Sequence, residues 1–251
     1  MGDHRKVPLP LGNENLCIVL VNPGHDGNIG AVARSMLNFG ITDLRVVGRS
    51  GGWSEEARNR AKNAQTVLDS AKLVSTFADA TSDCSVVIGT SGKREDGDKT
   101  AMRHFLLPDE LPERLSETEG RVAMVFGPEG KGLLNEELRM CDLLVTIPTW
   151  EGYPILNLSH AVTIICFRWY VNSDTVSPSG TGNRLLDPDL RNVLRSEVSR
   201  MVESMPTKDY KRKGIEETLV RVIMRGLPKD DEIHRLLSVI TEAADAFESS
   251  E

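Results

Sequence analysis

The chain has 251 residues, of which 39% are hydrophobic and 27% charged, and its net charge is −7. This is an ordinary composition for a globular protein with one large domain, or one domain and a smaller second one. No apolar run approaches the roughly 20 residues that span a bilayer, and the polar N-terminus lacks the apolar core of a signal peptide, so we expect a cytoplasmic protein and no membrane contact.

Continuous apolar runs of strand length follow a short N-terminal tail, residues 1–14. They cover 16–21, 44–47, 85–88, 122–126 and 143–147. Continuous rather than alternating runs indicate strands that are buried on both faces, as in parallel sheets. The four cysteines, Cys17, Cys84, Cys141 and Cys166, lie in such apolar segments, which predicts buried, reduced thiols.

Helical patterns separate these strands. Residues 28–39 carry one apolar stripe that stops at Gly40, and Ser54 is a predicted N-cap of an alanine-rich helix that reaches residue 71. A short helix is expected at 133–138, and an almost wholly apolar one at 158–171. The alternation predicts an α/β domain with a parallel sheet over 15–172.

The C-terminal part differs in composition. Residues 173–186 are polar, contain Pro and Gly, and are typical of a linker. Three amphipathic patterns then predict a small helical domain over 187–251, which at about 60 residues should lean on a partner surface. Residues 191–225 carry nine bases against five acids. They form either a solvated helical face or a patch that contacts phosphates.

Three segments place Gly, Asn or Pro where a strand is followed by a helix. They are Asn28-Ile29-Gly30-Ala31-Val32-Ala33-Arg34 with Asn38-Phe39-Gly40, then Phe126-Gly127-Pro128-Glu129-Gly130-Lys131-Gly132-Leu133, then Ile147-Pro148 with Leu156-Asn157-Leu158-Ser159. Ligands of parallel α/β sheets bind at such strand ends. The first segment matches neither the GxxxxGK[ST] phosphate loop nor a clean GxGxxG. We therefore expect one shared active site of another type.

Each feature also has a simpler interpretation. Arg34 could be a surface residue, Glu129 a charge at a helix N-terminus, and the glycines an ordinary tight turn. His25 and His160 flank two of the segments, but no carboxylate or Cys has metal-ligand spacing with them, so no metal site is expected. The loop Thr90-Ser91-Gly92, followed by Lys93 and Arg94, is a further strand end with basic character.

Together these segments resemble the SpoU group of S-adenosylmethionine-dependent RNA 2′-O-ribose methyltransferases, in the SPOUT superfamily. The resemblance covers about 155 residues. The strand end at 89–91 with its basic neighbours, and the helical C-terminal extension, look like the subgroup that methylates nucleotide 32 of the tRNA anticodon loop, on cytidine or uridine. The resemblance implies a homodimer, a C-terminal trefoil knot and tRNA as substrate.

The resemblance also implies roles for individual residues. The donor pocket for S-adenosylmethionine would consist of Thr90, Ser91, Gly92, Gly127, Glu129, Gly130, Ile147, Pro154, Ile155, Leu156 and Asn157. Catalysis would involve Arg34, supported by Asn28, Glu129, Asn157 and Ser159. Arginine is a poor general base at neutral pH. We therefore favour an interpretation in which Arg34 grips the adjacent phosphate and orients the ribose hydroxyl.

One position departs from the family pattern. Ile155 stands where the family often has Ser, which removes a hydroxyl that could position the substrate. Two alternatives stay open. One is a ribosomal RNA 2′-O-methyltransferase, which would differ only in the RNA chosen, and the other is a non-catalytic RNA-binding protein on the same fold, which Ile155 supports. We also expect the 158–171 helix, with Ile164, Ile165, Phe167 and Trp169, to form the dimer interface, and residues 173–251 to contribute tRNA affinity but not donor affinity.

Overall fold

The computed structural model describes residues 8–10, 12–92, 105–115, 120–172, 187–226 and 228–249. Within them, a 7-stranded sheet has the order β3-β2-β1-β6-β4-β7-β5, and every pairing is parallel. This confirms the predicted parallel sheet. The strands are β1 Leu16–Val21, β2 Asp43–Val47, β3 Lys72–Val74, β4 Val86–Thr90, β5 Phe105–Leu106, β6 Val122–Phe126 and β7 Leu143–Val145.

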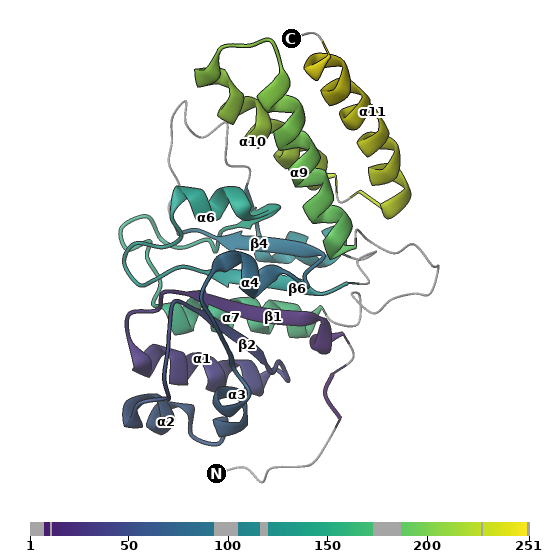
Figure 1. The fold of residues 1–251 in the computed structure, drawn as a ribbon. Helices are drawn as coiled ribbons and strands as arrows, with labels where there is room; N and C mark the ends of the chain where they lie inside the picture. The colour runs from purple at the N-terminus through teal and green to yellow at the C-terminus, as the bar shows by residue number, and fades with distance from the viewer. Residues whose placement is uncertain are drawn as a thin grey trace.

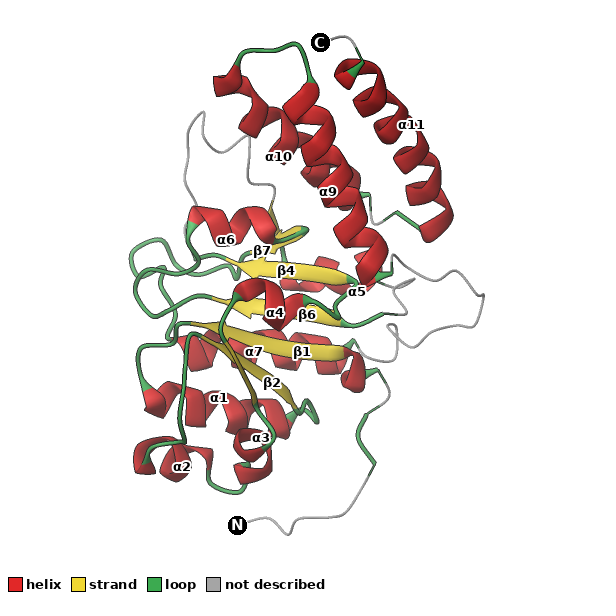
Figure 2. Cartoon of the chain, viewed as in Figure 1, coloured by secondary structure: helices red, strands yellow, loops and turns green. Residues whose placement is uncertain are grey.

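Helices cover both faces of the sheet (Figures 1 and 2). Alternate residues of β1 explain its continuous apolar sequence: Leu16, Ile18 and Leu20 belong to one buried cluster, and Cys17 and Val19 to the other. The first cluster packs under the helices α1, α2, α3, α5 and α7, and the second under α4 and α6. Their bounds are α1 Asp26–Asn38, α2 Glu55–Ala61, α3 Gln65–Asp69, α4 Phe77–Thr81, α5 Leu111–Arg114, α6 Asn135–Met140 and α7 Leu158–Val171. The cysteines are all buried and free, as expected.

The expected helix from Ser54 to residue 71 is wrong in its length. Ser54 does accept a hydrogen bond from Ala57 N (3.3 Å) and begins α2. However, the helix stops at Ala61, Lys62 has a φ of 51°, and α3 starts afresh at Gln65. The Gln65 side chain donates to the carbonyls of Arg58 and Lys62, at 2.8 and 2.9 Å, and so ties the start of α3 to the end of α2.

Smaller differences concern the ends of elements. Helix α1 begins at Asp26, two residues earlier than expected, and α6 begins at Asn135 rather than residue 133, because a turn closed by Gly132 N and Pro128 O (2.9 Å) precedes it. The sequence also missed β3 and β5, which have only 3 and 2 residues. Such short strands carry too few residues for a pattern.

The three C-terminal amphipathic patterns are helices, as expected: α9 Pro188–Ser204, α10 Asp209–Arg225 and α11 Asp230–Glu248. They share a hydrophobic cluster of their own, in which Leu194, Val198 and Ile233 are fully buried. They stand above α6 and β4 in Figure 1. The expected linker at 173–186 lies outside the described residues. None of the helices in the described ranges is long and apolar enough to cross a membrane.

A buried carboxylate attaches these helices to the sheet. The Asp142 side chain, which is 0% exposed, receives Arg191 Nε at 3.0 Å and Arg195 Nη2 at 2.9 Å, both from α9. Asp142 also accepts from Val87 N of β4 at 2.9 Å. Two of the nine bases in the expected basic patch are thus committed to packing. Arg200 is committed as well, because it pairs with the acids Glu197, Asp245 and Glu248.

Candidate active site

The three sequence segments meet through a chain of hydrogen bonds at the carboxyl ends of the strands. Glu129, from the segment after β6, accepts from Gly24 N at 2.8 Å and from Asn28 Nδ2 at 2.5 Å. Asn28 Oδ1 accepts in turn from Asn157 Nδ2 at 3.2 Å. Residues more than 100 positions apart are thereby joined. The expectation that they form one site is supported by this geometry, and the bonds define the polar network of the site.

Asn157 connects the polar network to α7. It is the N-cap of that helix, and its Oδ1 accepts from Ser159 N at 2.9 Å and from Ser159 Oγ at 2.8 Å. Asn is a favoured N-cap because its side-chain oxygen satisfies a free N–H of the first turn. Ser159 is buried and its hydroxyl is used in this bond. In this arrangement Ser159 orients Asn157, whereas Asn157 itself stays exposed.

The start of α1, which carries Asn28, is held by an ion pair that the sequence did not suggest. Arg49 Nη2 donates to Asp26 Oδ2 at 2.9 Å, and Ser54 N donates to the same oxygen at 3.3 Å. The hydrogen bond from Arg49 lowers the pKa of Asp26 to about 2. Asp26 is therefore ionised at neutral pH, in the first turn of α1, where a negative charge is favourable.

Glu129 is ionised in the polar network. Its burial disfavours the charge, but the hydrogen bonds from Asn28 and Gly24 outweigh this and lower its pKa below the ordinary 4.5. The carboxylate is therefore a weaker base than a free glutamate, and both of its oxygens already accept hydrogen bonds. This favours a positioning role for Glu129 over proton abstraction.

The lowered pKa of Glu129 predicts how the site responds to acid. A depressed folded-state pKa contributes stability above the unfolded value, and this is lost as pH falls through the folded value. The polar network should therefore stay intact above pH 4.5 and open only below it. Glu129→Gln, which cannot ionise, should remove this acid transition. NMR titration of the Asn28 side-chain amide measures it, and a wild-type transition above pH 5 would contradict the assignment.

Arg34 lies two turns after the start of α1 and is exposed. No ion pair or hydrogen bond of its guanidinium with another described residue is found. On the same helix, Ser35 Oγ lies 2.7 Å from Thr163 Oγ1, which also donates to Ser159 O at 2.6 Å. Helix α1 is thus fixed against α7 while the Arg34 side chain faces solvent. That is a suitable position for contacting a polyanionic substrate.

Glycine permits two close approaches at the site. A Cβ at Gly30 would lie 2.0 Å from the Ala57 carbonyl oxygen, so Gly30 lets α1 pack against α2. A Cβ at Gly127 would lie 2.2 Å from Leu133 N, where the loop after β6 folds back on itself. Gly130 and Gly132 in that loop have positive φ values of 77° and 68°. A side chain at these positions would be strained or would clash.

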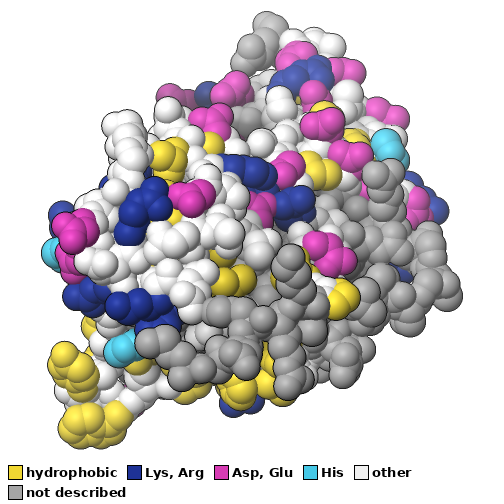
Figure 3. All heavy atoms as spheres, turned by 90° about the horizontal axis from the view of Figure 1, so that it is seen from below, with side chains coloured by type: hydrophobic (Ala, Val, Ile, Leu, Met, Phe, Trp, Pro, Cys, Tyr) yellow, Lys and Arg dark blue, Asp and Glu magenta, His cyan; other side chains and the backbone are white. Residues whose placement is uncertain are grey.

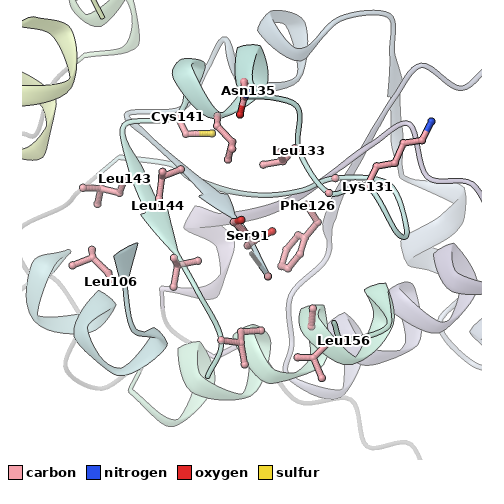
Figure 4. A pocket seen from close by; sticks show the side chains of 18 of the residues that line it. Ser91, Leu106, Phe126, Lys131, Leu133, Asn135, Cys141, Leu143, Leu144 and Leu156 are labelled. Carbon is pink, nitrogen blue, oxygen red and sulfur yellow. The ribbon is translucent and has the colours of Figure 1, made fainter. Parts of the chain in front are cut away.

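A cavity of about 640 Å³ opens beside the polar network. Its apolar wall includes Phe126, Leu144 and Leu156, and the Lys131 side chain extends away from it (Figure 4). All the expected donor-binding residues line it except Asn157, which lies in the polar network: Thr90, Ser91, Gly92, Gly127, Glu129, Gly130, Ile147, Pro154, Ile155 and Leu156. Lys93 and Arg94 lie outside the described residues. Glu129 belongs to both the cavity and the polar network.

The sequence missed the opposite wall of this cavity. Glu217, Arg221 and Arg225 of α10 line it, and Arg139 Nε of α6 lies 2.9 Å from Glu217 Oε1. Burial and the neighbouring Arg221 lower the pKa of Arg225. No local motif marks these residues, because they reach the cavity only when α10 packs beside α6. The helical C-terminal part therefore contributes to a cavity built mainly by the sheet.

Comparison with known proteins agrees with the motifs. Residues 15–167 match the SpoU rRNA Methylase family. The chain is 41% identical over 187 residues to the tRNA (cytidine-2′-O-)-methyltransferase TrmJ of Methanocaldococcus jannaschii, covering 74% of this chain and 78% of that protein. It is 40% identical over 159 residues to the tRNA (cytidine/uridine/adenosine-2′-O-)-methyltransferase TrmJ of Pseudomonas aeruginosa, covering 62% of this chain and 60% of that protein.

A solved structure shares most of the fold. The crystal structure of TrmJ from Z. mobilis ZM4 superposes with a TM-score of 0.72 at 27% identity, over 90% of this chain and 97% of that one. This similarity extends beyond the sheet into the C-terminal helices, because residues 15–167 alone make up less of the chain. The family match, the sequence relatives and the superposition all lead to one assignment: the chain belongs to the SpoU rRNA Methylase family, in the subgroup of the TrmJ proteins.

Proposed function

We propose that this protein transfers a methyl group from S-adenosylmethionine to a ribose 2′-hydroxyl of tRNA, at nucleotide 32 of the anticodon loop. The observation that carries the proposal is the polar network of Glu129, Asn28 and Asn157 at the mouth of the cavity. The names of the TrmJ relatives support tRNA and the 2′-oxygen. Nucleotide 32 rests on the sequence resemblance.

The cavity fits the methyl donor. Its volume of about 640 Å³ lies within the usual range of roughly 300–1,000 Å³ for small-molecule sites. Glycine-rich loops at 90–92 and 127–132 expose backbone groups to it, and Phe126 and Leu156 offer apolar surface for an adenine ring. When bound, S-adenosylmethionine supplies an electrophilic methyl group on a positively charged sulfur. The residues at 90–92, 127–130 and 154–156 would hold it.

The protein's own residues then have to place the hydroxyl. Asn28 and Glu129 fix the loop between β1 and α1, and with it the start of the helix that carries Arg34 two turns later. The Arg34 guanidinium grips the phosphate next to the methylated ribose, through paired hydrogen bonds that lysine cannot reproduce. Because arginine side chains are poor general bases, the hydroxyl proton passes to a phosphate oxygen or to water.

Nucleoside analysis tests the function and its alternatives. Transfer RNA and ribosomal RNA are incubated separately with the protein and the donor, digested by nucleases and analysed by mass spectrometry. We expect a 2′-O-methylated nucleoside from tRNA only, mapped to position 32 in digests to oligonucleotides. Methylation of ribosomal RNA alone would favour the first alternative. Calorimetric absence of donor binding would favour the non-catalytic one, for which Ile155 at the cavity is the only argument.

The tRNA surface includes an exposed basic face of α10. Arg191, Arg195 and Arg200 of α9 are committed to ion pairs. Three exposed lysines lie at the start of α10: Lys208 immediately before the helix, and Lys211 and Lys213 in its first turns. Removing residues 173–251 would not test this surface alone, because it would also leave Asp142 without its arginine partners and remove the α10 wall of the cavity. The three lysines can be replaced without disturbing the Asp142 ion pairs or the cavity wall.

Replacing these three lysines by alanine should weaken tRNA binding and flatten its salt dependence. Each lost phosphate contact lowers the slope of log K against log salt by about 0.7–0.9, so the slope should fall by about 2. Filter binding at several salt concentrations measures it. The matched control is the triple Lys→Arg variant, which keeps the charge and should bind normally. An unchanged slope in the alanine variant rules out contacts from this face.

A homodimer is the proposed assembly, with the exposed side of α7 at its interface. Phe39 packs against Phe167 and Tyr170 with ring centroids 6.0 and 5.9 Å apart, and both α7 rings are 45% exposed. Ile165 and Trp169, expected at the interface, lie instead in the chain's own core, at 1% and 5% exposure. Their substitution would unfold the protein and could not test assembly.

Phe167→Glu should convert the dimer to monomers. In a two-fold interface each subunit contributes the same surface, so one substitution places two carboxylates in the interface. The two buried charges would repel each other. Light scattering at micromolar concentration measures the mass. Val239→Glu on α11, also an exposed apolar residue (66%), is the control and should not change the mass. A monomeric wild type would refute the dimer, and a dimeric Phe167→Glu would refute only this placement.

The trefoil knot and the domain division complete the proposal. The segment after β7 returns to the loop after β6, because Pro154 and Gly127 line one cavity, and this is the contact that a knotted chain end would make. A separate hydrophobic cluster under α9, α10 and α11 supports a helical domain after the linker.

A further inference from the structure

Two aromatic side chains are left uncovered at the rim of the cavity. Figure 3 shows hydrophobic side chains protruding at one edge of the molecule, near Lys and Arg side chains. In the ranges that the structure describes, Tyr153 and Trp150 are the most exposed large hydrophobic side chains, at 80% and 79%. Aromatic rings gain considerable free energy when they leave water. Two such rings within four residues therefore indicate a binding surface.

The turn that carries them is built to hold the indole still. Tyr153 N donates to Trp150 O at 3.0 Å, and Thr149 Oγ1 donates to Pro154 O at 2.9 Å, which closes the turn at its base. A Cβ at Gly152 would lie only 2.4–2.7 Å from the six-membered ring of Trp150. The ring thus rests on the Gly152 backbone, and any other residue there would displace it. An exposed ring that rests on backbone in this way is partly preorganised for binding.

The position of the turn relates it to the reaction. Ile147 before it and Pro154 after it both line the cavity, and Asn157 of the polar network follows three residues later. A substrate that brings its ribose to the polar network therefore comes close to this turn. The exposed rings Phe167 and Tyr170, by contrast, lie further along α7 and pack with Phe39. The turn is therefore a better match for substrate than for a second copy of the chain.

We propose that Trp150 and Tyr153 form a stacking surface for an unpaired base of the RNA loop that carries the methylated nucleotide. The inference rests on the proposed function. Bases in a hairpin loop stack on one another, so a ribose hydroxyl reaches a protein site only when its nucleotide is splayed out. Aromatic side chains receive such bases because every base has a flat face, whatever its sequence. Trp150 and Tyr153 thereby hold the loop open at the cavity.

Tryptophan fluorescence reports on this surface directly. The chain has three tryptophans; Trp53 is half-buried with its indole bonded to Leu68 O at 2.7 Å, and Trp169 is 5% exposed. Trp150 should therefore dominate quenching by acrylamide. An anticodon stem–loop RNA should quench its emission and protect it from acrylamide, and Trp150→Phe should lack this signal. A Trp150 that is shielded before RNA is added points to a second copy and overturns the proposal.

Kinetics supply an independent arm. Trp150→Leu and Tyr153→Leu, which keep apolar bulk but lose the flat face, should each raise the KM for the stem–loop by about 5- to 100-fold. Trp150→Phe should stay within a few-fold, and donor affinity by calorimetry should be unchanged in all three. An active wild type with a normal KM in Trp150→Leu overturns this inference alone. A wild type that methylates no RNA defeats the proposed function, and the fluorescence result still decides whether bases stack here.

Discussion

Arg34→Ala is expected to lower the single-turnover rate of methyl transfer by at least about 100-fold while donor affinity stays within a few-fold. Arg34 is exposed, lies outside the cavity lining and has the guanidinium that best matches a phosphate. A charge-assisted contact that strengthens in the transition state is worth at least about 2–3 kcal/mol, which corresponds to the stated rate. Rapid mixing with saturating donor and tRNA measures the rate, and calorimetry the donor affinity.

The control variants separate charge from geometry. Arg34→Lys keeps the positive charge but loses the paired hydrogen bonds, so its rate should lie between those of the wild type and Arg34→Ala. Arg235→Ala removes another exposed arginine, from α11, and should change nothing, since Arg235 pairs with Asp231 at 3.3 Å on the same helix. Near-normal turnover in Arg34→Ala would show that orientation comes from other groups.

Asp142→Asn is expected to cost about 3–5 kcal/mol of unfolding free energy, the usual penalty for leaving a buried charge without its partner. Arg191 is 7% exposed and Arg195 27%, and both point their guanidinium groups at this one carboxylate. With the carboxylate gone, the buried Arg191 and the partly buried Arg195 remain as neighbouring cations without their acid. Because Asp142 links β4 to α9, the C-terminal helices should lose their attachment first. Urea denaturation measures the total, and hydrogen exchange the order of opening.

Two further variants test the cause. Asp142→Leu combined with Arg191→Met replaces most of the ion pair by apolar side chains and should recover part of the lost stability. Asp69→Asn removes the acid of an exposed pair with Arg58, at 57% and 46% exposure, and should leave the urea midpoint nearly unchanged. Equal midpoints for Asp142→Asn and the wild type would show that the buried pair does not hold the helices in place.

Much of the site could be predicted from residue order, for a simple reason. Parallel strands end at one edge, so the segments after β1, β6 and β7 had to gather there once the apolar runs were recognised as strands. Asn28, Glu129 and Asn157 do meet at that edge, with Glu129 and Asn28 2.5 Å apart. The elements β1 and α7 have the expected bounds, because their local patterns agree with their environment.

What the sequence by itself determined was the set of buried strands, the three loops and the family. Tertiary structure decided the rest, since contacts between distant residues leave no local pattern. The sequence from Ala57 to Ala71 has the pattern of one helix, yet the helix ends before Lys62. The Gln65 side chain donates a hydrogen bond to the Lys62 carbonyl at this interruption. The basic stretch of 191–225 fits either a solvated helical face or a phosphate surface, yet Arg191 is buried against Asp142. Only the folded structure shows which bases are exposed and which are paired, because that depends on the side chains that pack against each of them.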